Sequence, residues 1–206
     1  MLRNKENERD GSMAQDRRTR YTRMVLNESL VDLLQVKPLS KITVKELSSR
    51  SGINRSTYYR HFQDPYDQFE QLLQDFFAGV SRYIRGNSGD VWSRSSFDLT
   101  EKLCQYLYEN RILYLVLLNA STQNQLEEKM RTVLPYVFDA LSNQRVFIDE
   151  ELRAYVFTYL SAATNSILKR WLEHDADRYT PQEIANLIHR INIGGISEIS
   201  KEKCAL

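Results

Sequence analysis

Residues 42–62, ITVKELSSRSGINRSTYYRHF, constrain the fold of this chain more than any other segment. Thr43 is followed three residues later by Glu46, and this spacing of a hydroxyl and a carboxylate is a capping box that starts a helix. Gly52 comes about two turns later and can adopt the left-handed conformation that closes a helix before a tight turn. A second short helix follows that turn. The segment is therefore typical of a helix-turn-helix unit.

The second short helix has an apolar side and a polar side. Either Asn54 or Ser56 can cap it, and we expect it to run to about Gln63. Tyr58 and Phe62 are four residues apart and face inward. A polar, basic and aromatic outer side fits the major groove of DNA, whereas the alternative is an ordinary helical hairpin with a solvated face. The residues on that outer side are Arg55, Ser56, Tyr59 and Arg60.

The charge of the chain is distributed unevenly, although its net value is only +1. Residues 14–62 contain ten Lys or Arg against four Asp or Glu, so this part carries +6. Residues 1–13 contain three of each sign, which leaves about −5 for residues 63–206. A basic segment in an otherwise acidic chain is expected where only that segment meets a polyanion, so the charge favours nucleic-acid binding.

The composition and the apolar periodicity predict an all-α fold. Glycine and proline are scarce, at 7 and 4 of 206 residues, and 42% of the residues are hydrophobic, which favours long amphipathic helices over a multi-stranded sheet. We expect about nine helices, over residues 16–36, 44–51, 54–63, 65–84, 95–109, 110–118, 121–143, 148–174 and 181–195.

Proline marks three helix boundaries. Pro38 ends the first helix, because the residue before a proline disfavours helical backbone. Pro65 is placed as the first residue of a helix that Asp64 caps. Pro181 follows Thr180 in a similar start signal. Three regions are expected, namely a disordered arm at 1–15, a helix-turn-helix domain at 16–63, and a regulatory and dimerisation domain at 64–206.

The run I-T-V-x-E-L-x-x-x-S-G-I-x-x-S-T-x-Y-x-H-F at 42–62 resembles the signature of the TetR (tetracycline repressor) family of transcriptional regulators. Residues 17–77 look like the DNA-binding head of that family. The rest of the chain resembles the family's body in helix count and length. Trp171-Leu172 and the segment TPQEIANLI at 180–188 resemble one of its C-terminal subgroups. The resemblance implies a three-helix head and a helical ligand-binding and dimerisation body.

The resemblance also implies which residues meet double-stranded operator DNA. Arg55 would bind guanine through two hydrogen bonds, and His61 would donate to a phosphate. Three arginines near residue 20 would follow phosphates or enter the minor groove as a flexible arm, or would remain a solvated tail. The full set is Arg17, Arg18, Arg20, Thr43, Lys45, Arg55, Ser56, Thr57, Tyr59, Arg60 and His61.

One position departs from the family pattern. The family places a lysine at the start of the fourth helix, where the ammonium group and the helix N-terminus both meet phosphate. This chain has Pro65 there, next to Asp64, so the lysine charge is absent. The contact from the helix dipole could survive. Arg60 and Gln63 are the residues that could compensate.

The last two helices carry apolar stripes suited to pairing with a second copy. Two such helices from each chain would form a four-helix bundle, and the alternative is that the stripes are core within one chain. The expected dimer-face residues are Leu152, Tyr155, Val156, Tyr159, Ala163, Ile167, Trp171, Ile184, Leu187, Ile188 and Ile191.

The family resemblance implies a small-molecule pocket in the body, with ligand binding relieving repression. The abundance of aromatic residues suggests an apolar or planar effector, although each side chain could equally be core. The candidate lining residues are Phe69, Phe76, Phe77, Tyr83, Phe97, Tyr106, Tyr114, Tyr136 and Phe138.

We expect no enzymatic activity, cofactor or metal. His61, His174 and His189 are scattered, and no catalytic or phosphate-loop pattern occurs. Cys104 and Cys204 lack zinc or redox spacing and are expected to be reduced thiols in the cytoplasm. No apolar run suggests a secretion signal or a membrane partner. A ligand-responsive repressor is the first functional prediction, and a protein-partner adaptor or coactivator on the same scaffold is the alternative.

Overall fold

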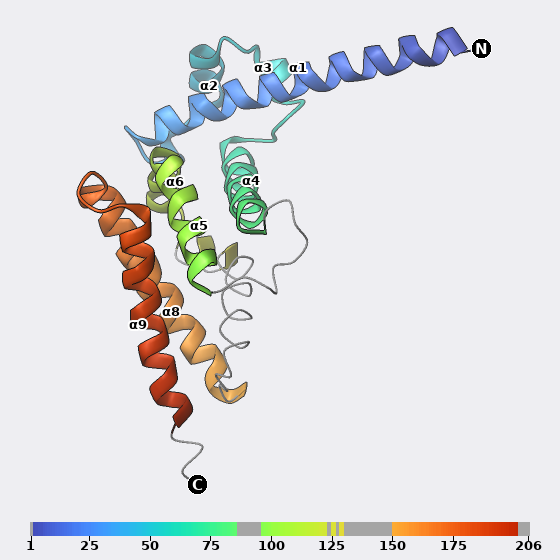
Figure 1. Cartoon of the computed structure of the whole chain (residues 1–206). Coiled ribbons are helices and arrows are strands. Elements are labelled where there is room, and N and C mark those ends of the chain that lie inside the picture. Colours follow the sequence, from blue (N-terminus) through green and yellow to red (C-terminus); the bar gives the residue numbers. More distant parts are fainter. Residues whose placement is uncertain (1, 86–95, 123–124, 127, 130–149, 202–206) are drawn as a thin grey trace. The chain divides into compact units, whose positions relative to one another are not determined.

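The computed structural model describes residues 2–85, 96–122, 125–126, 128–129 and 150–201 (Figure 1). Every regular element in these ranges is a helix, which confirms the predicted all-α class. The chain divides into two compact units, residues 1–73 and 74–206. The division falls inside helix α4 (Pro65–Arg85), so the domain boundary that we placed after residue 63 remains a prediction.

The first unit contains α1 (Leu2–Leu34), a 3₁₀ turn (Leu39–Lys41), α2 (Val44–Ser51), α3 (Arg55–Tyr58) and the start of α4. Side chains from all four helices and from the connecting segments form its buried core. These are Leu26, Leu30, Leu33, Ile42, Leu47, Tyr58, Phe62, Phe69, Leu72 and Leu73.

The start of α1 corrects the prediction of a disordered arm at residues 1–15. The helix begins at Leu2 rather than near Asp16, and Figure 1 shows its N-terminal part running on past α2 and α3. The added segment is rich in Glu, Lys and Arg, which are good helix formers, and it contains no proline. A single glycine, Gly11, costs about 1 kcal/mol in a helix, which leaves the helix continuous.

Helix α2 begins and ends as predicted. The Thr43 hydroxyl accepts a hydrogen bond from the backbone N–H of Glu46 (3.3 Å), and the Glu46 carboxylate accepts one from the backbone N–H of Thr43 (3.0 Å). Gly52 closes the helix with φ +71°, in the left-handed region. The turn between α2 and α3 is therefore set by local chemistry.

Helix α3 is shorter than predicted. It covers Arg55–Tyr58 only, and Asn54 is its cap, accepting from the N–H of Ser56 at 3.0 Å. Beyond it, the N–H groups of His61 and Phe62 both donate to the carbonyl of Tyr58 (2.9 and 3.0 Å). The chain thus continues to Phe62 as tight turns rather than as regular helix.

In the second unit the structure describes α5 (Ser96–Glu109), α6 (Arg111–Ala120), α8 (Glu150–Arg170), a π-helical turn (Trp171–Asp175) and α9 (Pro181–Lys201). These bounds match the predicted elements, except that α9 continues past residue 195 and α8 changes to π-helix after Arg170. Most of the helix predicted over 121–143 lies outside the described residues.

The core of the second unit is apolar, with a few internal hydrogen bonds that fix helix ends. Helix α5 packs along α9 through buried leucines and isoleucines, including Leu99 and Ile188. The Trp171 indole donates to the carbonyl of Tyr179 at 2.9 Å, which ties the π-helical turn to the loop before α9. Thr180 and Glu183 form the predicted cap of α9.

Candidate nucleic-acid interface

The segment around α3 separates its apolar side from its polar side. Tyr58 and Phe62 are buried in the core of the first unit. Tyr59 is 59% exposed, and Arg55 and Arg60 are exposed beside it. The rings of Tyr58 and Tyr59 meet edge to face at 5.6 Å, so the buried tyrosine supports the exposed one. The structure therefore presents the outer side that the sequence predicted.

Several polar groups of this surface are already held by intramolecular hydrogen bonds. The Ser56 hydroxyl donates to the Asn54 side chain (3.2 Å), and the Arg60 guanidinium donates to the Thr57 hydroxyl (3.2 Å). In the part of the chain that the structure describes, the side chains of Arg55 and Lys45 make no hydrogen bond or ion pair, and both are exposed. These two cations are accordingly accessible to an anionic partner.

A chain of contacts beneath the surface connects α1 to the turn after α3. The Arg23 guanidinium lies 5.0 Å above the Phe62 ring and donates to Gln71 at 2.9 Å. Gln71 donates to Asp67 (2.9 Å), whose carboxylate accepts from the backbone N–H of Gln63 (2.8 Å). These contacts hold the end of the exposed segment against α4. No local pattern in the sequence connects residues so far apart, so these contacts could not be predicted from it.

His61 lies half-buried at the end of this segment. Its pKa is lowered from the usual value of 6.5, first by burial and then by the neighbouring charges of Arg23 and Arg60. A neutral imidazole can donate one hydrogen bond, and a nearby phosphate would favour its protonated form. This placement is compatible with the predicted phosphate contact.

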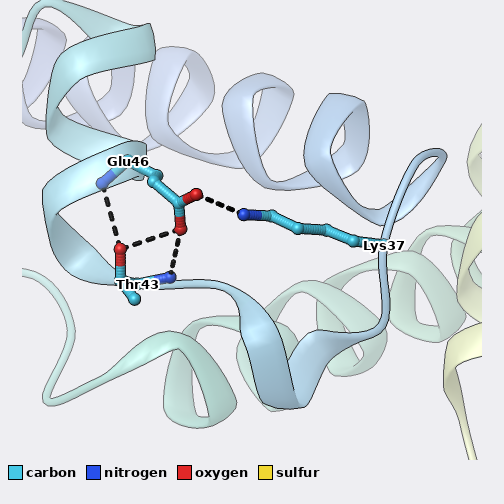
Figure 2. A network of polar contacts seen from close by, with 3 residues as sticks. All are labelled: Lys37, Thr43 and Glu46. Atoms are coloured by element: carbon cyan, nitrogen blue, oxygen red, sulfur yellow. Dashed lines mark hydrogen bonds and ion pairs between the residues drawn. The ribbon is translucent and has the colours of Figure 1, made fainter.

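Figure 2 shows the start of α2 as a network of three side chains. Lys37, from the loop after α1, forms an ion pair with Glu46, whose carboxylate also accepts from the Thr43 hydroxyl at 2.8 Å. These hydrogen bonds lower the pKa of Glu46 to about 2. Thr43 and Lys45 are exposed at this end of the helix. Lys37 was not a predicted site residue.

The three arginines near the start of the predicted head lie on α1 rather than on a flexible arm. Arg17, Arg18 and Arg20 are exposed, and Arg20 pairs with Asp16 on the same helix. The helix sets the direction in which each of these side chains leaves the backbone. This corrects the expectation of a flexible arm.

The start of α4 is blocked by its own cap. The Asp64 carboxylate accepts hydrogen bonds from the N–H groups of Tyr66 (2.8 Å) and Asp67 (2.9 Å), and Pro65 is buried and has no N–H. The donors that could bind phosphate at this helix end are therefore occupied by a carboxylate. These N–H groups are therefore not open to another acceptor, and the lysine of the family pattern is absent as well.

The predicted dimer face divides into an exposed part and a buried part. Tyr155 and Tyr159 on α8 are 76% and 65% exposed, and Leu152, Leu187 and Ile191 are also exposed. Trp171, Ile184 and Ile188 are buried inside the unit, which assigns them to its core and corrects that part of the prediction. Val156, Ala163 and Ile167 are half-buried.

The exposed part encloses an apolar groove of about 400 Å³ between α8 and α9. Apolar side chains dominate its walls, and Asn192 is the polar residue among them. The lining residues are Leu152, Tyr155, Val156, Tyr159, Leu160, Ile191, Asn192 and Gly195. An exposed apolar surface of this kind is typical of an interaction site.

The structure brings five of the predicted pocket residues together. The ring of Phe76 packs against those of Phe77, Tyr106 and Tyr114 at 5.6–6.1 Å, and Tyr83 packs against Tyr106 at 5.3 Å. The Tyr114 hydroxyl donates to Asn165 at 2.6 Å. These rings pack against one another as core residues do.

The remaining pocket candidates lie elsewhere. Phe69 belongs to the core of the first unit, and Phe97 packs against His189 at 5.5 Å. Tyr136 and Phe138 lie outside the described residues. No helix within the described ranges is both long and apolar enough to cross a membrane.

Comparisons with known proteins support the resemblance to the TetR family. Residues 94–194 match a TetR-family model described as a transcriptional regulator C-terminal region. A comparison with curated protein sequences gives no significant match.

Among solved structures, a TetR transcriptional regulator from Streptococcus agalactiae is 21% identical, with a TM-score of 0.63 over 88% of this chain and 98% of that one. The dihydroxyacetone kinase operon activator DhaS is 17% identical, with a TM-score of 0.60 over 85% and 96%. NalD, the secondary repressor of a multidrug efflux pump in Pseudomonas aeruginosa, is also 17% identical, with a TM-score of 0.52 over 88% and 96%. At these identities the likeness describes the fold, and together with the matching C-terminal region it shows that this chain belongs to the TetR family of transcriptional regulators.

Proposed function

We propose that this protein is a sequence-specific, DNA-binding repressor that acts in the cytoplasm as a homodimer, without enzymatic activity. The observation that carries the proposal is the exposed side of the α3 segment. Arg55 and Tyr59 point away from a core that holds Tyr58 and Phe62. A short helix with arginine at its first residue suits entry into the major groove.

The basic charge of the same region supports this assignment. Lys45 at the start of α2 and the arginines on α1 are exposed, so they can reach phosphates on either side of the groove. Most affinity for DNA comes from such phosphate contacts, while sequence preference comes from base contacts. We therefore assign base recognition to Arg55 and Tyr59, and backbone contacts to Lys45, Thr43 and His61.

Dimerisation through α8 and α9 is the second part of the proposal. One half-site gives too little affinity to compete with genomic DNA, so paired heads are needed. The exposed tyrosines and leucines of these helices, with the groove between them, offer an apolar surface that a second copy can cover. The symmetric arrangement predicts a palindromic operator.

An effector response is the third part. We assign it to the aromatic cluster around Phe76 and Tyr106, where a planar or apolar molecule could insert by displacing rings. Tyr83 is exposed and marks the accessible edge of the cluster. Binding there would favour one arrangement of the protein over another and release the operator.

Selection from random duplexes tests the DNA assignment. The wild-type protein should enrich a palindromic sequence. Arg55→Ala should relax the base preference at one position of each half-site. The difference in binding free energy between the preferred base and the others should fall there by about 1–3 kcal/mol. Arg178→Ala, an exposed arginine in the second unit, is the matched control and should leave the preference unchanged. Unchanged affinity and preference in the Arg55 variant would refute the assigned recognition surface.

A protein-partner adaptor or coactivator is the second candidate. The occupied N-terminus of α4 favours it, because Asp64 and Pro65 remove a phosphate contact from the surface. The name of the similar protein DhaS describes an activator, which adds to this candidate. No enriched DNA at low salt, together with specific capture of another protein, would support the adaptor over the repressor.

A further inference from the structure

The ion pair between Lys37 and Glu46 has a feature that helix capping alone does not require. One oxygen of the Glu46 carboxylate accepts from the backbone N–H and the hydroxyl of Thr43 (3.0 and 2.8 Å). The other oxygen pairs with the ammonium group of Lys37, which comes from the loop after α1 (Figure 2). The capping contacts are complete without the lysine.

A capping box also does not need a negative charge at this position. Glutamine serves as well as glutamate, because the cap uses only a side-chain oxygen acceptor. The charge of Glu46 is therefore an additional property. It sits in the first turn of α2, next to the exposed Lys45, on the part of the head to which we assign phosphate contacts.

An unpaired carboxylate at that position would oppose DNA. Residues in one helical turn lie within about 5 Å of each other along the axis. Electrostatic effects extend to about 8 Å at physiological ionic strength. A phosphate at the start of α2 would therefore lie within the range of the Glu46 charge. The side chains of Lys37 and Glu46 are 23% and 42% exposed, so their charges reach the solvent side.

We propose that Lys37 is a positioning residue that neutralises Glu46, so that the capping box can hold the first turn of α2 without repelling the DNA backbone. The proposal rests on the proposed DNA-binding function. It assigns Lys37 an electrostatic role, and its own contact with DNA is not required.

Three variants separate this role from a purely structural one. Lys37→Met removes the ammonium group and keeps most of the side-chain length. Glu46→Gln keeps the cap and removes the negative charge. The double variant removes both charges. The probe is a random-sequence duplex of about 30 base pairs, long enough for a dimer, because non-specific binding depends mainly on phosphate electrostatics. Affinity is measured between about 50 and 200 mM salt.

The two single variants should change the affinity for DNA in opposite directions. Lys37→Met should weaken binding by roughly threefold at low salt, and Glu46→Gln should strengthen it by a similar factor. The slope of log affinity against log salt should change by up to about 1 in opposite directions. The double variant should bind like the wild type, and Lys37→Arg, which retains the charge, should do so as well.

The pair formed by Arg50 and Asp32 supplies the matched control. It also joins α2 to α1, at 2.9 Å, but it lies in the last turn of α2. Arg50→Met combined with Asp32→Asn removes an ion pair between the same helices with the same change in charges as the double variant. It should leave the affinity and the salt slope near wild-type values.

The outcomes are distinguishable. If both single variants weaken binding and the double variant is no better, the pair acts only by stabilising the head, and the inference is overturned. If the wild-type protein does not bind the duplex even at low salt, the proposed function fails and this inference fails with it. Circular dichroism checks folding, and if Lys37→Met does not fold, stronger binding by Glu46→Gln supports the inference and unchanged or weaker binding overturns it.

Discussion

The two units of this protein arrange their exposed surfaces by different kinds of interaction. In the first unit, side-chain hydrogen bonds and ion pairs hold several of the surface residues around α2 and α3, and the exposed Arg55 and Lys45 lie among them. Examples are Thr43 with Glu46, and Asn54 with Ser56. In the second unit, the exposed surface on α8 and α9 is apolar and includes Tyr155 and Tyr159. A polar, prearranged surface suits a charged partner, whereas an apolar surface becomes stable only when another apolar surface covers it.

This difference indicates which kinds of substitution should impair the function of each unit. In the first unit, function depends on the charges and hydrogen bonds around α2 and α3. In the second unit, it depends on apolar area and on the close packing of rings.

The largest effect is expected on the α8–α9 face. Replacing Tyr155 and Tyr159 together by Glu would place four carboxylates in the proposed dimer interface. Burying unpaired charges costs several kcal/mol, so the dimer dissociation constant should rise by on the order of 100-fold. Light scattering should then report the mass of a single chain, 24.2 kDa, at micromolar concentration. DNA binding should be lost at the same time.

Ile112→Glu supplies the control for this experiment. Ile112 is 65% exposed on α6, outside the α8–α9 face, so a charge there should leave the dimer intact. If the double tyrosine variant remained dimeric while Ile112→Glu dissociated, the interface would lie on another surface of the second unit.

The next effect concerns the aromatic cluster of the second unit. A Cβ atom at Gly79 would lie 2.4 Å from the hydroxyl oxygen of Tyr106, which is closer than any real contact. Gly79→Ala should therefore displace the tyrosine. Because alanine gains about 1 kcal/mol over glycine inside a helix, the net loss in free energy of unfolding should be at most about 2 kcal/mol in denaturant titrations. Tyr106→Phe removes the clashing oxygen and leaves the next ring atom at 3.4 Å.

Combining the two substitutions sharpens this prediction. The double variant should be more stable than Gly79→Ala alone, because the phenylalanine leaves room for the added methyl group. A strictly additive loss of stability would show that Gly79 is needed for a different reason, such as the local backbone conformation of α4.

The structural features that were predicted correctly are those determined by residues close together in the sequence. The cap at Thr43, the turn at Gly52 and the start of α4 at Pro65 all depend on side chains within a few positions of the backbone that they fix. The buried and exposed sides around Tyr58 and Tyr59 followed from helical spacing for the same reason. Local chemistry determines these features before any tertiary contact forms.

Features that depend on distant residues could not be predicted. Periodicity placed Ile188 and Ile191 on one stripe, but packing against α5 buries only the first of them. Lys37 reaches Glu46 only because the loop after α1 folds back, and nothing in the spacing indicates this pair. The length of α3 was overestimated because tight turns after Tyr58 keep the same inward direction for Phe62 without regular helix.

The smallest expected effect is a dependence of DNA affinity on pH, which tests the polar surface of the first unit. The pKa of His61 is lowered by burial and by the charges of Arg23 and Arg60, so the imidazole of the free protein is neutral near pH 7. A phosphate placed beside it would raise this pKa, and DNA binding would then be accompanied by proton uptake. Affinity for DNA should therefore increase as the pH falls from 7.5 toward 6, by about twofold to threefold.

His61→Gln keeps a hydrogen-bond donor but does not titrate, so the same pH change should leave its affinity nearly constant.

Lowering the pH should have the opposite effect on the stability of the folded protein. A histidine whose pKa is lowered in the folded protein favours the unfolded chain when it is protonated, so stability should fall as the pH drops below about 6.5. Fluorescence anisotropy with a labelled duplex and separate thermal unfolding at each pH distinguish the two effects. If affinity were equally pH-dependent in the wild type and in His61→Gln, the proton taken up would belong to another group, and the phosphate contact assigned to His61 would lose its support.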